Sequence, residues 1–145
     1  MKYIKYEQII DATDYINHLS KLKHELPLGA YTFASDKNHY DFTGDYNVHD
    51  LSIEKIVMTD KAGQIDGDIY FIKNKFKHTK DLIIEYKNIT NFSVEKTNEN
   101  FIHKDKFGEV IIDEILPAKN VITHEILLTN SKIKISCEDL FAKWI

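Results

Sequence analysis

The chain has 145 residues, of which 43% are hydrophobic and 29% charged, as in an ordinary globular protein with one core. All 19 basic residues are lysines and the formal net charge is −4, which argues against a nucleic-acid binder, because such proteins rely on basic surfaces rich in arginine. No apolar run reaches the roughly 20 residues that a membrane helix needs. We therefore predict a single domain, residues 1–145.

The chain ends and the cysteine content indicate the compartment. The first residues, "MKYIKYEQIIDATDY", have no apolar core of a secretory signal, and Lys2 stands where myristoylation would need glycine. Cys137 is the single cysteine, which excludes an internal disulfide and a CxxC zinc site. We expect a protein of the reducing cytoplasm, without a membrane partner.

Residues 6–26, "YEQIIDATDYINHLSKLKHEL", carry apolar residues at spacings of three and four, which predicts an amphipathic helix. Its apolar stripe consists of Ile9, Ile10, Ile16, Leu19, Leu22 and Leu26. Pro27 and Gly29 follow it and are expected to end it. Thr13 offers an alternative, because it could cap a shorter helix from residue 14, with a break near residue 12.

After Pro27 the apolar residues alternate and turn signals are frequent, which predicts strands. The predicted strands are 30–35, 39–48, 49–59, 64–73, 80–88, 89–97, 107–116, 120–129 and 131–137. In residues 64–73 we expect Ile65, Ile69 and Phe71 to point inward and Gly67 to form a bulge. The tail "EDLFAKWI" predicts either a helical turn or a final edge strand.

These elements predict the α+β class. The N-terminal helix needs a surface for its apolar stripe, and an antiparallel sheet offers one such face. We therefore expect this amphipathic helix to pack on a twisted antiparallel meander of seven to ten strands. Such a sheet can fold over into a half-barrel or a sandwich.

The sequence "HEILL" at residues 124–128 differs by one residue from the His-Glu-x-x-His signature of zinc proteases. Leu128 replaces the second histidine, and the flanking β-branched residues predict a strand. Neighbouring residues of a strand point to opposite faces, so His124 and Glu125 are not expected to share one ion.

A second metal hypothesis joins two strands. If the strands that carry His49 and His124 were neighbours, the two rings could meet, and Asp113 or Glu114 would complete a site of two histidines and one carboxylate. The simpler interpretation is that each ring packs on the sheet and bonds a backbone carbonyl. The other histidines, at 18, 24, 39, 78 and 103, are expected on the solvated surface.

Acidic and aromatic residues alternate in "SDKNHYDFTGDYNVHD", residues 35–50. The spacing does not match a calcium-binding loop, and nothing marks the paired carboxylates of a glycosidase. A protein-binding surface explains the pattern better, because acids with interspersed tyrosines suit a patch that covers a basic cleft. We predict this interface at Asp36, Tyr40, Asp41, Asp45 and Tyr46.

Complete catalytic motifs are absent from the sequence, including GxSxG, the P-loop and GxGxxG. Cys137 alternates with Ile133 and Ile135, which predicts a buried and inert thiol. Trp144 is expected to dock the C-terminal tail onto the body. We therefore predict no enzyme activity, no catalytic or metal-binding residue and no cofactor.

The C-terminal part, "FGEVIIDEILPAKNVITHEILLTNSKIKISCEDLFAKW", with the strand "HDLSIEKI", resembles the small bacterial immunity proteins of polymorphic toxins, including contact-dependent growth inhibition systems. The resemblance covers residues 80–145 and that strand, and it lies in length, acidity and the α+β pattern. It implies a protein that binds a cognate toxin domain, often a nuclease, and blocks its active site. It transfers no functional residue.

Three functional readings remain open on sequence alone. The first is an immunity protein that covers a basic toxin domain, as a monomer or weak homodimer. The second is a metal- or ligand-binding domain that uses His49, His124 and nearby carboxylates. The third is a regulatory domain that pairs with itself through an exposed sheet edge.

Overall fold

The computed structural model describes residues 1–97 and 106–145 and confirms the α+β class. The elements of this part are α1 (Thr13–Leu22), α2 (Leu28–Ala34), β1 (Ser52–Lys61), β2 (Gln64–Ile72), β3 (Leu82–Lys87), β4 (Asn91–Lys96), β5 (Val110–Ala118), β6 (Val121–Leu128), β7 (Ser131–Cys137) and β8 (Asp139–Trp144). They form two antiparallel sheets of four strands, β1-β2-β3-β8 and β4-β7-β6-β5, called here the first and the second sheet.

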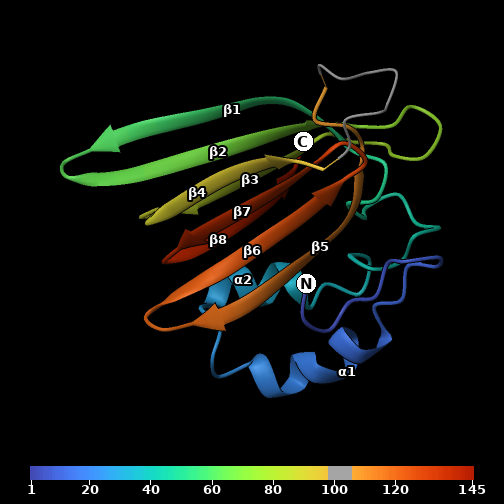
Figure 1. Ribbon diagram of the computed structural model, residues 1–145, viewed down its shortest axis with the longest axis horizontal. Helices are drawn as coiled ribbons and strands as arrows, with labels where there is room; N and C mark the ends of the chain where they lie inside the picture. Colours follow the sequence, from blue (N-terminus) through green and yellow to red (C-terminus); the bar gives the residue numbers. More distant parts are fainter. Residues whose placement is uncertain (98–105) are drawn as a thin grey trace.

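The two sheets are joined where a pair of strands folds over. The pair β3–β8 ends at Lys87 and Asp139, and the pair β4–β7 begins at Asn91 and Ser136. Backbone hydrogen bonds continue around this corner, from the N–H of Glu138 to Lys87 and from the N–H of Thr90 to Ser136. The second sheet therefore lies against the first, as Figure 1 shows, and the result is sandwich-like.

The strand order departs from a simple meander. β8 returns to pair with β3, so the tail is an edge strand, which was one of its two predicted forms. The expected bulge at Gly67 is wrong, because the register there is regular and the shifts lie at Ile53/Lys55 and Val110/Ile112. Two three-stranded meanders, β1–β2–β3 and β5–β6–β7, follow the chain order as predicted.

The N-terminal helix is shorter than the apolar spacing predicts. Residues 5–12 form a loop closed by reciprocal backbone bonds between Lys5 and Asp11. The helix begins at Thr13, close to the start of the shorter alternative, but Ala12 and not Thr13 stands at the N-cap. Ile9 lies outside the helix and is 80% exposed. The helix rests on the second sheet through Tyr15, whose hydroxyl accepts from the N–H and donates to the carbonyl of Ile115 on edge strand β5.

The predicted strand at 30–35 is wrong, because these residues belong to α2. Pro27 precedes α2 with φ −65°, a conformation suited to a helix start. Asp139 of β8 then accepts the N–H groups of Gly29 and Ala30, at 3.2 and 2.9 Å. This cap comes from the other end of the chain, so local alternation could not reveal it.

The predicted strand at 39–48 is also wrong, because this segment is a chain of turns. The N–H of Gly44 donates to Asp41, and the side-chain amide of Asn47 donates to Gly44. The turns carry Val48 and Leu51 into the core between the sheets. Residues 36–51 therefore close the sandwich on one side.

The core confirms several side-chain predictions. Ile69 and Phe71 are buried, whereas Ile65 lies on the same face but is about half exposed near the hairpin end. Cys137 is fully buried beside Ile133 and Ile135. Within the described residues, no helix is long and apolar enough to cross a membrane.

Candidate functional site

A chain of four polar side chains crosses the interior and is called here the polar chain: Tyr86, His124, Asp113 and His39. They come from β3, β6, β5 and the turn after α2. The Tyr86 hydroxyl lies 2.9 Å from Nδ1 of His124, and Nε2 of His124 lies 2.8 Å from Oδ2 of Asp113. Nε2 of His39 lies 2.7 Å from Oδ1 of Asp113.

The hydrogen-bond partners indicate where the protons lie in the polar chain. Nδ1 of His39 faces the Phe33 carbonyl at 2.9 Å and its Nε2 faces Asp113, so both nitrogens donate and the ring is an imidazolium. His124 donates from Nε2 to Asp113, and its Nδ1 accepts from the Tyr86 hydroxyl. The core therefore contains an ion pair between His39 and Asp113, with a neutral His124 beside it.

The electrostatics agree that Asp113 is charged. Burial by itself would raise the pKa of Asp113, but the charge of His39 and the hydrogen bonds from both histidines outweigh it and hold that pKa well below its usual range. Burial raises the pKa of Tyr86 well above its ordinary value. Asp113 is thus charged and Tyr86 neutral at physiological pH.

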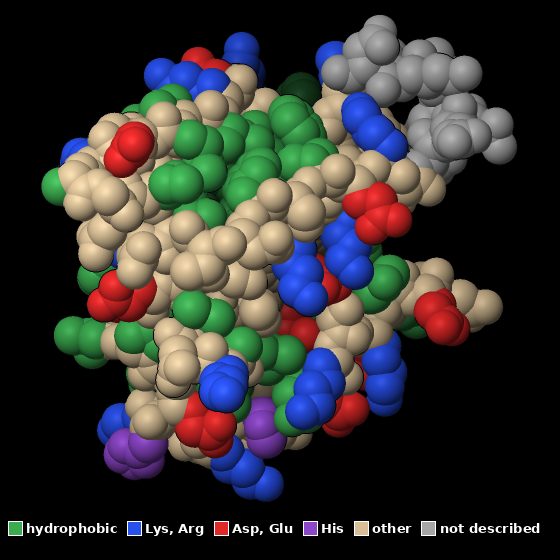
Figure 2. Space-filling model, turned by 60° about the vertical axis from the view of Figure 1, so that its left-hand side comes forward, with side chains coloured by type: hydrophobic (Ala, Val, Ile, Leu, Met, Phe, Trp, Pro, Cys, Tyr) green, Lys and Arg blue, Asp and Glu red, His purple; other side chains and the backbone are tan. Residues whose placement is uncertain are grey.

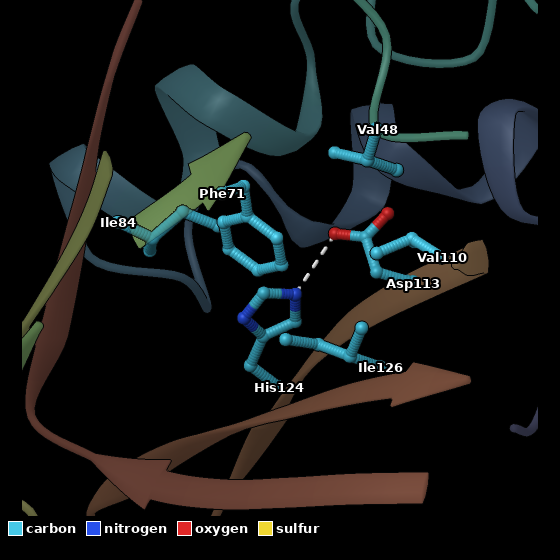
Figure 3. Close-up of a pocket in the computed structure, with 7 residues that line it drawn as sticks. All are labelled: Val48, Phe71, Ile84, Val110, Asp113, His124 and Ile126. Atoms are coloured by element: carbon cyan, nitrogen blue, oxygen red, sulfur yellow. Dashed lines mark hydrogen bonds and ion pairs between the residues drawn. The ribbon is translucent and has the colours of Figure 1, made fainter. Parts of the chain in front are cut away.

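The polar chain is closed to substrates. The side chains of His39 and His124 are 0% exposed and that of Asp113 is 2% exposed. Figure 3 shows the cavity beside Asp113 and His124, which measures about 10 Å³ and has room for at most one water. Its other walls are apolar: Val48, Phe71, Ile84, Val110 and Ile126. This arrangement can hold both sheets and the α2 turn together, but it leaves a reactant no space.

The alternative hypothesis that His49 and His124 meet is wrong. His124 faces Ile115 and Ile135 on its neighbouring strands, whereas His49 lies in the turns before β1. Nδ1 of His49 is 2.8 Å from Oδ2 of Asp50. Within residues 1–97 and 106–145, no three or more His, Cys, Asp or Glu side chains are arranged to hold a metal ion.

His49 and Asp50 instead belong to a half-buried surface cluster. Lys77 donates from Nζ to Oδ2 of Asp50 at 3.1 Å and to the His49 carbonyl at 3.3 Å. Burial raises the pKa of Asp50, but its bonds with His49 and Lys77 outweigh that effect and lower it. Asp50 has a φ of 71°, and this ring of contacts holds the left-handed turn.

The opposite faces of His124 and Glu125 are confirmed. His124 points into the core, and Glu125 on the outer face contacts Nζ of Lys132 at 3.1 Å and the Met1 amino group. Glu114 lies opposite Glu125 in the ladder and accepts the N–H groups of Lys2, Tyr3 and Ile4. Residues 1–4 therefore cover this outer face and leave Glu114 unable to join a metal site with His124.

The predicted interface residues do not all reach the surface. Asp36, Asp41 and Asp45 are exposed. Tyr46 is 37% exposed and meets the Trp144 ring edge-on, with centroids 5.5 Å apart. Tyr40 is half-buried, and its hydroxyl donates to the Asp113 carbonyl at 3.2 Å.

Two grooves flank α2, and Asp36 lines both of them. The α1 groove, of about 210 Å³, is lined by Ile16, Leu19, Ala34, Ser35, Asp36, Lys37, Tyr40 and Asp41. The β8 groove, of about 280 Å³, is lined by Leu28, Gly29, Thr32, Phe33, Asp36, Phe141, Ala142 and Trp144. Exposed apolar side chains thus lie beside the exposed carboxylates of Asp36 and Asp41.

Sequence reasoning missed the buried histidines. His39 and His78 were expected on the surface, but His78 is buried and bonds the carbonyl of Asn47 through Nε2 at 3.0 Å. His18 stacks on Tyr3, His24 is exposed, and residue 103 lies outside the described residues. Polar neighbours in sequence gave no sign of these burials, because each ring also bonds a distant residue, Asp113 for His39 and Asn47 for His78.

Comparisons with known proteins add little. No protein-family model and no curated protein matches the chain. One similar solved structure is that of an uncharacterized protein from Neisseria gonorrhoeae, with a TM-score of 0.46 and 20% sequence identity, covering 66% of this chain and 91% of that one. A likeness of this degree carries no argument about function.

Proposed function

We propose that this protein is an immunity-type inhibitor that binds a basic toxin domain, such as a nuclease, and covers its active site. The observation that supports the proposal most directly is the surface around α2, where two grooves with exposed apolar walls share Asp36. Apolar anchors next to charged groups are the usual composition of protein interfaces.

The carboxylates of this surface are held in place before any partner arrives. Oδ1 of Asp36 accepts the backbone and side-chain N–H groups of Asn38, at 2.8 and 3.0 Å. Oδ1 of Asp41 accepts the hydroxyl and the N–H of Thr43, and these bonds lower the pKa of Asp41. Each Oδ2 remains available for a lysine or arginine of the partner.

Charge supports the class of partner. A nuclease active site must attract phosphate and is therefore basic, whereas this chain has a net charge of −4. Opposite charges accelerate association and lose this effect as salt rises. The apolar side chains, among them Leu28 at 80% exposure, would then supply the contacts that keep the complex together.

The proposal predicts that a toxin domain is encoded immediately upstream, and the experiment measures association with the product of that neighbouring gene. We expect a one-to-one complex whose association rate falls about tenfold or more at low salt in the double variant Asp36→Lys, Asp41→Lys. Glu54→Lys, an equally exposed acid on β1, is the matched control and should change the rate little.

Two results would count against the proposal. An unchanged rate in the double variant eliminates the α2 surface as the interface. No complex with any protein encoded beside this one eliminates the immunity function itself. Circular dichroism of each variant shows whether the fold is retained.

A further inference from the structure

We propose that the exposed edge of β4 is a binding site for an extended segment of a partner protein, which would add a strand to the second sheet. The segment would carry apolar residues at alternate positions and basic residues between them. This site lies apart from the α2 surface, and the inference does not depend on the proposed function.

The register of β4 leaves hydrogen-bonding groups at its outer edge. The N–H of Thr97 donates to the carbonyl of Asn130, so the odd-numbered residues of β4 face β7 for their backbone bonds. The backbone N–H and C=O groups of Phe92 and Val94 then point away from β7. Among the strands of residues 1–97 and 106–145, β7 is the one that pairs with β4, so no described strand faces Phe92 and Val94 from the other side.

An apolar surface on the inner face of the first sheet lies beside this edge. Cross-strand neighbours Tyr86, Gly67 and Met58 lie in one row on the inner face of the first sheet, and exposure along this row rises from 1% at Tyr86 to 45% at Met58. The second sheet therefore does not cover β1. Ile65 on β2 and Val94 on β4 are also exposed, at 46% and 43%.

The surface view agrees with this description. Figure 2 shows hydrophobic side chains gathered in a broad patch on the side where the free end of the β1–β2 hairpin comes forward. A strand paired with β4 would continue the second sheet over this patch. Its inward side chains would cover Met58, Ile65 and Val94, which removes apolar surface from water.

Steric reasons favour a single added strand over a second copy of this chain. A copy pairing edge to edge through its own β4 would bring its first sheet along, since β4 is backed by that sheet. That sheet would have to occupy the layer that β1 and β2 already fill. An extended segment has no second layer and avoids this clash.

Charge indicates which kind of residue lies between the apolar residues of the added segment. Glu95 points to the outer face opposite Lys132, but the Lys132 ammonium pairs with Glu125. No ion pair is formed by Glu95 within the described residues. A basic residue on the added strand would therefore find a free carboxylate beside it.

The probe is a short synthetic peptide of alternating valine and lysine, and the readout is amide hydrogen exchange of the full chain. In antiparallel pairing, the valines that face inward also bond to β4. We expect exchange at Phe92 and Val94 to slow about tenfold with the peptide. A peptide N-methylated at its valines should give no protection, and one N-methylated at its lysines should still protect.

Paired variants distinguish binding at this site from nonspecific binding of the peptide. Met58→Lys should abolish protection, whereas Val57→Lys, which changes an exposed neighbour on the opposite face of β1, should leave it intact. No protection at millimolar peptide, or equal loss in both variants, would overturn the proposal. A dimer that itself protects the β4 edge would overturn it in favour of a second copy.

Discussion

Replacing Asp113 by asparagine tests the role of the polar chain, because the two side chains have the same shape. Asp113 accepts one imidazole N–H on each oxygen, at 2.7 and 2.8 Å. Asparagine has one acceptor oxygen, so its amide would turn N–H groups toward the remaining ring. One charge-assisted bond is lost, a buried donor is left unpaired and the His39 imidazolium loses its counter-ion.

The magnitude follows from the burial of these groups. Removing one partner of a buried ion pair costs about 3–5 kcal/mol. A domain of this size has a total stability of about 5–15 kcal/mol, so the variant should lose a large part of it. Urea unfolding followed by circular dichroism measures the loss. Asp60→Asn, at an exposed acid, is the control and should stay within about 0.5 kcal/mol of the parent.

The same variant should change the response to acid. The pKa of Asp113 is depressed in the fold, so its contribution is fully present above the unfolded value of about 3.9 and is lost as the pH falls toward the folded value. The parent should therefore lose more stability than Asp113→Asn between about pH 5 and pH 2. A loss under about 1 kcal/mol at pH 7, or parallel acid profiles, would refute the ion pair.

Other substitutions test individual contacts. Tyr15→Phe leaves the N–H and carbonyl of Ile115 without their partner and should cost about 1–3 kcal/mol in urea unfolding; a neutral result would mean that water replaces the hydroxyl. Gly29→Ala places a methyl group against the Leu140 carbonyl and should cost about 1–3 kcal/mol, with α2 displaced from β8; unchanged stability would contradict this close approach. Burial raises the pKa of Cys137 to about 12, so a thiol reagent should react at the rate of unfolding, and fast labelling of the native protein would disprove its burial.

Local patterns in the sequence predicted most of the sheet. Alternation in residues 64–73 and 131–137 is strong, because Ile69 and Phe71 line the inner face of the first sheet and Ile133 and Ile135 that of the second. The split between His124 and Glu125 follows from the same period of two. Alternation does not reveal which strands are neighbours, and so the pairing of β8 with β3 was not predicted.

The two wrongly predicted strands have different physical causes. The α2 segment, "LGAYTFA", contains residues with strand preference, but Asp139 caps its N-terminus from β8. Residues 39–48 alternate, yet Asp41 and Asn47 bond nearby backbone groups and hold turns instead.

The polar chain could be predicted only in part. Asp113 and His124 were candidates for one site, but His39 was assigned to the surface because its neighbours in sequence are polar. Its burial depends on the turn after α2, which places Nδ1 against Phe33 and Nε2 against Asp113. A cluster built from four separate segments leaves no spacing in the sequence to recognise.

The most direct test of the proposed function is a titration of toxin activity. The protein is added in steps to the product of the gene immediately upstream, which the proposal predicts to be a toxin, and the remaining activity, such as cleavage of nucleic acid, is measured. The account predicts a linear fall that reaches zero at one equivalent, with a right-shifted curve for Asp36→Lys, Asp41→Lys. Full activity at a large excess of this protein would contradict it.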